Sequence, residues 1–230
     1  MDDEHGGRIK VTTKTGDDGT TGLLFGGRVR KDDVIIEAVG AVDEAQAAIG
    51  LARAFLKTAG RNTTISGIAA GGDVARKSTL STRDSSNAAG GNTTASEDAV
   101  GADLDALLVH VERDLWVLMA EVSGFHRGHD QLVPEKTCVT EAMVSGLETA
   151  SDVMIERLQI SKGFAVPGES VQGALLDNAR VAVRKAERRV VAAVLSSDTQ
   201  AGKYLNRLSD LLWILARFAD GESLMAVESR

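Results

Sequence analysis

Segment 179–189, ARVAVRKAERR, carries the side chains of this sequence that are best suited to chemistry on a charged ligand. At 3.6 residues per turn, Arg180, Arg184 and Glu187 fall at i, i+4 and i+7, so two guanidinium groups and a carboxylate line one side of a helix. Positions 180–189 hold five basic residues and one acid, although the whole chain has a formal net charge of −7. Two interpretations stay open at this point. The segment is either a solvated helix face laced with ion pairs, or a site whose arginine forks bind the phosphate oxygens of a nucleoside triphosphate.

A second stretch with possible ligand chemistry is 9–31, which contains five glycines, five threonines and two aspartates and shows no sustained helical period. This composition predicts a loop with a turn at 16–19. Glycines let backbone N–H groups turn toward an anion, and Lys14 and the threonine hydroxyls can donate to phosphate oxygens. The P-loop pattern GxxxxGK[ST] is absent, so this count alone does not separate a phosphate site from an ordinary loop.

The elements that must position these residues are helices, because apolar residues recur every three to four positions in five separate segments. No stretch alternates with period two for long enough to make a sheet. The sequence therefore predicts an all-α, five-helix up-and-down bundle that is preceded by a glycine/threonine-rich N-terminal loop, whose phosphate-binding role stays open at this point. The expected helices are 34–57, 102–123, 137–158, 170–195 and one that begins near 200.

We expect one domain over 1–230, with a flexible tail at 1–8 and a low-complexity insertion at 59–100. The insertion is rich in Ala, Gly, Ser and Thr and has no aromatic residue, so it cannot bury enough apolar surface to offset its ordering entropy. Helix connections in bundles are normally far shorter, which favours a dispensable segment.

Composition narrows the function further. The acidic balance argues against a general nucleic-acid binder, and no apolar run is long enough for a membrane span. The single cysteine, Cys138, excludes an intramolecular disulfide and fits a reducing compartment. The acidic N-terminus has no apolar core of a signal peptide. We therefore expect a cytoplasmic protein that binds neither nucleic acid nor membrane.

Four segments together resemble the PduO-type ATP:cob(I)alamin adenosyltransferases, in order and at compatible spacing. These segments are TKTGDDGTTGL, KDDVIIEAVGAVDE, FAVPG followed by ARVAVRKAERR, and YLNRLSDLLWILAR. The resemblance implies a five-helix bundle that forms a homotrimer with ATP held between subunits. It implies transfer of the 5′-deoxyadenosyl group of ATP to the cobalt of cob(I)alamin, with release of triphosphate and with Mg²⁺ bound through the ATP phosphates. A flavoprotein reductase and an adenosylcobalamin-dependent mutase are the implied partners.

The same resemblance assigns roles to individual residues. Arg180, Arg184, Asp43 and Glu187 match catalytic positions, Asp43 being an acid that pairs with the position of Arg180 across a subunit boundary. Phe164 matches an aromatic residue that crowds the lower face of the corrin. The ATP-binding positions are matched by Thr13, Lys14, Thr15, Gly16, Thr21, Lys31, Arg184, Lys185, Glu187, Arg188 and Asn206.

Cob(I)alamin is itself a strong nucleophile, so the absence of a Ser–His or Cys–His arrangement is expected of such an enzyme. Three departures from the family pattern lie near the motifs: Lys185 replaces an arginine, Glu169 a glycine and Ala41 a threonine. The alternative function is a non-catalytic ATP- or corrinoid-binding bundle that acts as a sensor or cofactor carrier. A purely structural bundle would leave the glycine/threonine loop unexplained.

Overall fold

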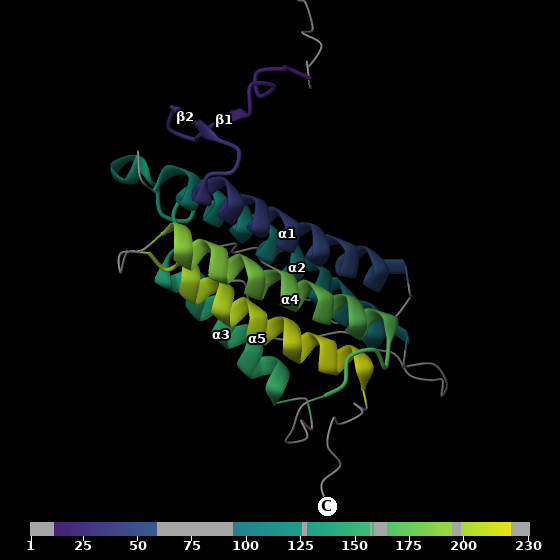
Figure 1. Ribbon diagram of the computed structural model, residues 1–230. Coiled ribbons are helices and arrows are strands. Elements are labelled where there is room, and N and C mark those ends of the chain that lie inside the picture. Colours follow the sequence, from purple (N-terminus) through teal and green to yellow (C-terminus); the bar gives the residue numbers. More distant parts are fainter. Residues whose placement is uncertain are drawn as a thin grey trace, which may run out of the picture.

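The computed structural model describes residues 12–58, 94–125, 128–156, 158, 165–194 and 199–221, and most of these residues are helical (Figure 1). The predicted all-α, five-helix architecture is confirmed. The helices are α1 (Val34–Thr58), α2 (Thr94–Gly124), α3 (Glu141–Ile155), α4 (Val171–Ala193) and α5 (Ala201–Asp220), with a short 3₁₀ helix, η1, at His129–Gln131.

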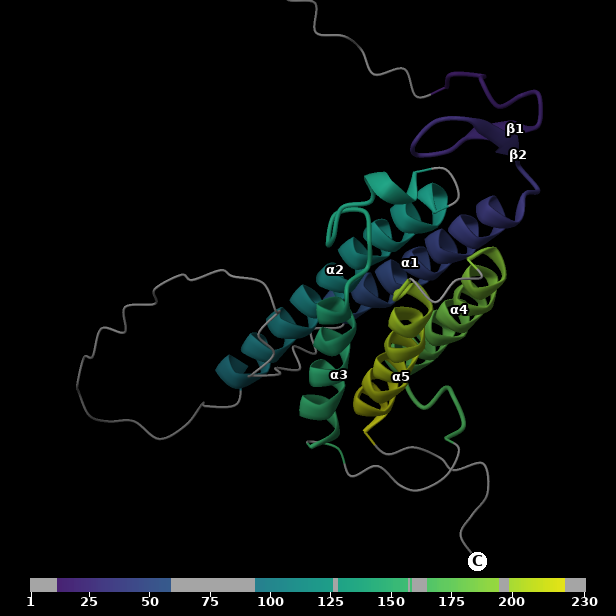
Figure 2. The same ribbon diagram turned by 90° about the vertical axis from the view of Figure 1, so that its left-hand side faces the viewer.

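Helix α4 lies at the centre of the arrangement, packed against α1 on one side and α5 on the other. α2 covers α1, and α3 covers α5 (Figure 2). Contacts of Glu37 with Arg189 and of Glu44 with Lys185 show that α1 and α4 run antiparallel. The helix that carries the arginine segment is therefore supported on both flanks.

Three helices begin where a capping side chain accepts a hydrogen bond from a backbone N–H group of the first turn. Ser170 Oγ accepts a hydrogen bond from Gly173 N at 2.9 Å at the start of α4, and Thr140 Oγ1 accepts from Met143 N at 3.3 Å at the start of α3. Asp33 Oδ1 accepts from Ile35 N at 2.9 Å, so Asp33 caps the start of α1. Each such cap contributes about 1 kcal/mol to helix stability.

The core is built almost entirely from Ala, Val, Leu, Ile and Met, as the low aromatic content predicts. Its largest fully buried side chain is Tyr204 of α5, whose hydroxyl donates to Asp114 Oδ2 of α2 at 2.8 Å. Burial raises the pKa of Asp114 above its ordinary value, and burial together with the Asp114 charge raises that of Tyr204. This polar pair joins α2 to α5 inside an otherwise aliphatic core.

Two details differ from the sequence-based expectation. Residues 20–22 (β1, Thr20–Gly22) and 28–30 (β2, Arg28–Arg30) form a small antiparallel sheet, because glycines with positive φ at 26 and 27 turn the chain back on itself. α2 begins at Thr94, upstream of the predicted start at 102, so the end of the expected insertion is helical. The tail at 1–8 and residues 59–93 lie outside the described ranges. None of the described helices combines the length and apolarity needed to cross a membrane.

Candidate active site

We define the outer side of α4 as Arg180, Arg184, Glu187 and Arg188, which lie beside the buried face of the helix on the flank that contacts α5 through Glu187. Val183 and Ala186 of that buried face are 0% exposed, whereas Arg184 and Arg188 are exposed. Arg188 Nη1 donates to the carbonyl oxygen of Arg184 at 2.9 Å. Within the described ranges, no acidic side chain forms an ion pair with Arg184 or Arg188. Two adjacent turns therefore present guanidinium groups that remain available to an anion.

The side of α4 that faces α1 behaves differently. Lys185 Nζ lies 2.6 Å from Glu44 Oε2, and Arg189 Nη2 lies 3.9 Å from Glu37 Oε2. All four side chains are about half exposed, so these pairs contribute little to stability. The ion-pair interpretation of segment 179–189 thus holds for the α1-facing side and for Arg180, which pairs with Asp177. The anion-binding interpretation fits Arg184 and Arg188.

Asn206 on α5 borders the outer side of α4. Its Nδ2 donates to Glu187 Oε1 at 3.3 Å, and its Oδ1 accepts from Arg207 Nη1 at 2.7 Å. Arg207 Nε in turn donates to Glu148 Oε1 of α3 at 2.7 Å, and this bond raises the pKa of the Arg207 guanidinium. Sequence reasoning missed Arg207, although it directly follows Asn206. The structure thus brings two of the predicted ATP-binding residues, Glu187 and Asn206, into contact.

The N-terminal loop is organised by Arg28, a residue that sequence reasoning also missed. Arg28 Nε donates to Thr20 Oγ1 at 2.9 Å, and its Nη2 donates to the carbonyl oxygen of Thr15 at 2.5 Å. Asp18 Oδ1 accepts from both the backbone N–H and the hydroxyl of Thr20, at 2.9 and 2.8 Å. These two hydrogen bonds, followed by the charge of Arg28, lower the pKa of Asp18. The sequence signal that could have found Arg28 is its positive charge within the glycine/threonine-rich stretch 9–31.

Several predicted ATP-binding residues meet in this loop. The Oγ1 atoms of Thr13 and Thr15 lie 3.0 Å apart. A Cβ atom at Gly16 would come within 3.2 Å of Lys31 Nζ and 3.1 Å of the carbonyl oxygen of Thr20, so glycine permits this close approach. Lys14 has a φ of 62°, a backbone conformation that is uncommon outside glycine and often found at functional turns. Thr21 lies in β1, in register with Val29 of β2.

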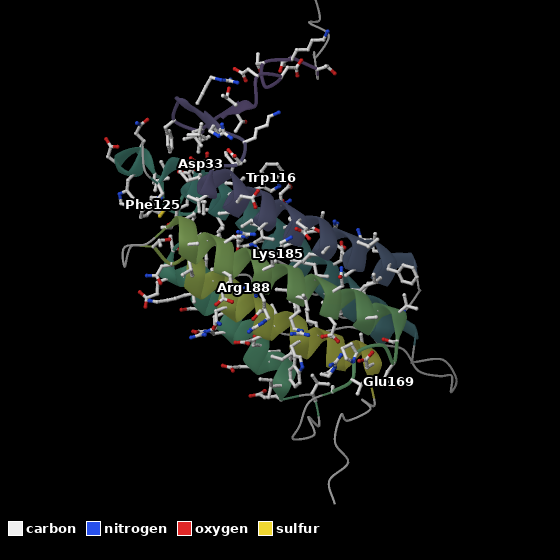
Figure 3. The ribbon with its side chains drawn as sticks, viewed as in Figure 1. Asp33, Trp116, Phe125, Glu169, Lys185 and Arg188 are labelled. Carbon is white, nitrogen blue, oxygen red and sulfur yellow. The ribbon has the colours of Figure 1, made fainter. Side chains whose placement is uncertain are left out.

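One chain does not bring the loop and the outer side of α4 together. The loop stands beyond the N-terminal end of α1, which Asp33 marks, while Lys185 and Arg188 lie along the bundle (Figure 3). In the parts of the chain that are described, no hydrogen bond or ion pair joins loop residues 12–31 to α4. The two groups of predicted ATP-binding residues thus belong to separate surfaces of the subunit.

Asp43 and Arg180 are also separated. Asp43 is exposed on α1, and among the described residues its carboxylate has no hydrogen-bond partner. Arg180 instead donates from Nε to Asp177 Oδ1 at 2.9 Å. From the Lys185–Glu44 and Arg189–Glu37 pairs, the antiparallel helices place Arg180 roughly 5–9 Å along the axis from Asp43. The predicted pairing therefore does not occur within one chain.

The remaining features singled out in the sequence are Phe164, the departures from the family pattern, the single cysteine and possible metal ligands. Phe164 lies outside the described residues. The departures at Glu169 and Ala41 fall at an exposed position before α4 and in the core, respectively. Burial raises the pKa of the Cys138 thiol, and the charge of Glu121 raises it further, which disfavours a nucleophilic thiolate. The described residues contain no group of three or more His, Cys, Asp or Glu that could hold a metal ion.

Comparison with known proteins identifies relatives along almost the whole chain. A family model described as cobalamin adenosyltransferase matches residues 11–70 and 60–219. A corrinoid adenosyltransferase from Mycobacterium tuberculosis is 34% identical over 221 residues, which are 94% of this chain and 92% of that protein. The corrinoid adenosyltransferase from Bacillus subtilis is 32% identical over 217 residues, covering 94% of this chain and 89% of that protein.

Solved structures agree on the fold. Two variants of a PduO-type ATP:corrinoid adenosyltransferase from Lactobacillus reuteri, each complexed with cobalamin and ATP, superpose with TM-scores of 0.64 and 0.67 at 21% and 19% identity. These matches cover 96% of this chain and 98% and 100% of the other chains. The identity is too low for them to carry more than the architecture. Together with the extent of the family-model match, the sequence relatives show that this chain belongs to the cobalamin adenosyltransferase family.

Proposed function

We propose that this protein transfers the 5′-deoxyadenosyl group of ATP to the cobalt of cob(I)alamin, forming adenosylcobalamin and releasing triphosphate. The observation that carries the proposal is that the guanidinium groups of Arg184 and Arg188 on α4, beside Glu187 and Asn206, form no ion pair with any described acidic residue, in a chain of this family. Unpaired arginines match the phosphate oxygens of ATP in number of donors and in geometry.

In this reaction the electron pair on Co(I) forms a bond to C5′ of the ribose, and the C5′–oxygen bond breaks. The leaving triphosphate takes that electron pair, so negative charge grows on it in the transition state. Arg184 and Arg188 stabilise this charge, and the rigid α4 holds them in place before the reaction. The protein supplies no nucleophile, which agrees with the raised pKa of Cys138.

The second half of the ATP site is the N-terminal loop, with Thr13, Lys14, Thr15, Gly16 and Thr21 around the phosphates and Lys31 beside Gly16. Because the loop and the outer side of α4 are apart within one chain, we place each active site between two subunits of a homotrimer. Asp43 of one subunit then pairs with Arg180 of the next. Both groups have capacity for this, since among the described residues of its own chain Arg180 donates from Nε alone and Asp43 has no hydrogen-bond partner.

Three further assignments complete the proposal. Magnesium enters bound to ATP phosphates, because the described residues offer no cluster that could hold it alone. Phe164 contacts the lower face of the corrin and favours departure of the axial ligand, which eases the reduction of Co(II) to Co(I). A flavoprotein reductase supplies the electron, and an adenosylcobalamin-dependent mutase receives the product.

The test is a turnover assay under anaerobic conditions. Purified protein is mixed with ATP, magnesium and chemically reduced cobalamin, and the Co(I) absorbance is followed. The proposal predicts decay of this absorbance with formation of adenosylcobalamin. A rate no higher than that of the protein-free mixture would refute the enzyme. Tight binding of ATP and cobalamin without turnover would instead support the sensor or carrier.

A further inference from the structure

Arg217, near the C-terminal end of α5, is a buried cation that the proposed reaction does not use. The residue is 5% exposed, and its Nη2 donates to Asp177 Oδ2 at 2.5 Å and to Asp220 Oδ2 at 2.9 Å. The guanidinium carbon also lies 5.9 Å from the ring centroid of Trp213. One side chain thus connects α5 to a carboxylate of α4 in a place that water hardly reaches.

Asp177 passes this connection on to Arg180. It is 4% exposed, and while Oδ2 faces Arg217, Oδ1 accepts the Nε–H of Arg180 at 2.9 Å. Arg180 is partly exposed, and its terminal Nη groups donate to no other described residue. Because a guanidinium is planar, fixing the Nε edge also fixes the direction of the Nη groups.

We propose that Arg217 is a positioning residue for Arg180 and acts through the buried carboxylate of Asp177. This inference rests on the proposed function, in which the Nη groups of Arg180 meet Asp43 of a neighbouring subunit. Holding Arg180 in one orientation before assembly lowers the entropy cost of forming the site. Asp177, flanked by two arginines, keeps the relay close to electrical balance, which buried charges require.

The relay is anchored at the start of α4. Asp220 Oδ1 accepts from the hydroxyl of Ser170 at 2.8 Å and from its backbone N–H at 3.1 Å. A Cβ atom at Gly173 would lie 2.0 Å from the same oxygen, so only glycine admits Asp220 there. Asp220 therefore has a fixed position, and it fixes Arg217 in turn.

A rival explanation is that the four charges only fasten the end of α5 to α4. A double-mutant cycle separates the two. Asp177→Asn should lower kcat/KM for ATP by about tenfold or more when Arg180 is present, because the charge-assisted bond to Nε is weakened. In the Arg180→Ala background the same substitution should change kcat/KM by less than about twofold. Equal factors in both backgrounds would overturn the inference and leave a structural fastener.

Asp105→Asn is the matched control. Asp105 accepts from Arg53 Nε at 2.7 Å and so joins α2 to α1 by the same kind of pair, away from the relay. The Asp105→Asn substitution should change kcat/KM by the same factor in the wild type and in the Arg180→Ala background.

A measurement without substrate covers the case in which Asp177→Asn does not fold or the wild-type protein shows no turnover. Exchange of the Arg180 Nε–H with water is followed by ¹⁵N NMR in the wild type and in Arg217→Lys, which keeps the charge but loses the fork. The relay predicts that exchange becomes about tenfold faster or more in the variant. Unchanged exchange overturns the inference. Absence of turnover in the wild type refutes the proposed function alone, and the NMR comparison still decides the relay.

Discussion

The N-terminal loop and the outer side of α4 both carry predicted ATP-binding residues but are held in different ways. The loop owes its shape to its own hydrogen bonds, chiefly those of Arg28 to Thr15 and Thr20, and it extends beyond the bundle (Figure 1). Helix α4 packs between α1 and α5, and its inward-facing residues, such as Val183 and Ala186, are fully buried. The difference indicates that α4 is preorganised for charge stabilisation, whereas under the proposed function the loop reaches its ligand through assembly with a second subunit.

The largest expected effect comes from removing a charge on the rigid half. Arg184→Ala should lower kcat/KM by about 100-fold or more, since it removes a donor to the leaving group. The thermal midpoint should stay near the wild-type value, because Arg184 is exposed and pairs with no described acid. Turnover equal to that of the wild type would remove Arg184 from the site.

A smaller effect is expected when the organisation of the loop is broken. Arg28→Ala removes the bonds to Thr15 and Thr20 and should raise KM for ATP by about tenfold, with a lesser change in kcat. Arg30→Ala is the matched control in the same strand, because Arg30 pairs only locally with Asp32 at 2.8 and 2.7 Å. Equal KM values for both variants would show that loop shape does not govern ATP binding.

Among substitutions of basic residues, we expect the smallest change in kcat/KM on the α1-facing side of α4. Lys185→Ala breaks the exposed pair with Glu44, so stability should fall by about 0.5 kcal/mol or less. Because Lys185 is engaged with α1, we expect kcat/KM to change by less than about threefold, well below the effect at Arg184. A loss as large as that of Arg184→Ala would place Lys185 on the triphosphate and contradict the distinction between the two sides of α4.

The smallest expected effect is a difference between the loop and α4 in how amide exchange depends on pH. Hydrogen bonds from Thr20 depress the pKa of Asp18 below 3.8, so its contribution to loop order is present above pH 3.8 and is lost as the pH falls through the folded-state pKa. Amide exchange at Thr20 should accelerate there, while α4 amides stay protected. Asp18→Asn should remove this pH dependence, and identical acid responses of loop and helix in the wild type would contradict the assignment.

The sequence predicted the five helices well because their apolar periodicity is long and regular, and Ser170 and Asp33 are capping residues recognisable by type. It could not separate Lys185 from Arg184, since only the neighbouring helix α1 shows that Lys185 meets an acid. Arg28, Asp177 and Arg217 were missed because their partners lie on other turns or helices. The short β1–β2 pair escaped because each strand has three residues, too few for a detectable alternation.

The central claim is that each active site combines the loop of one subunit with α4 of another. Two inactive variants, Lys14→Ala and Arg184→Ala, are co-expressed with different tags, and mixed assemblies are isolated and assayed. The account predicts recovery of about a third of wild-type activity, because one of the three sites in each mixed trimer then receives an intact loop and an intact α4 from different subunits. Mixed assemblies no more active than the separate variants would contradict it.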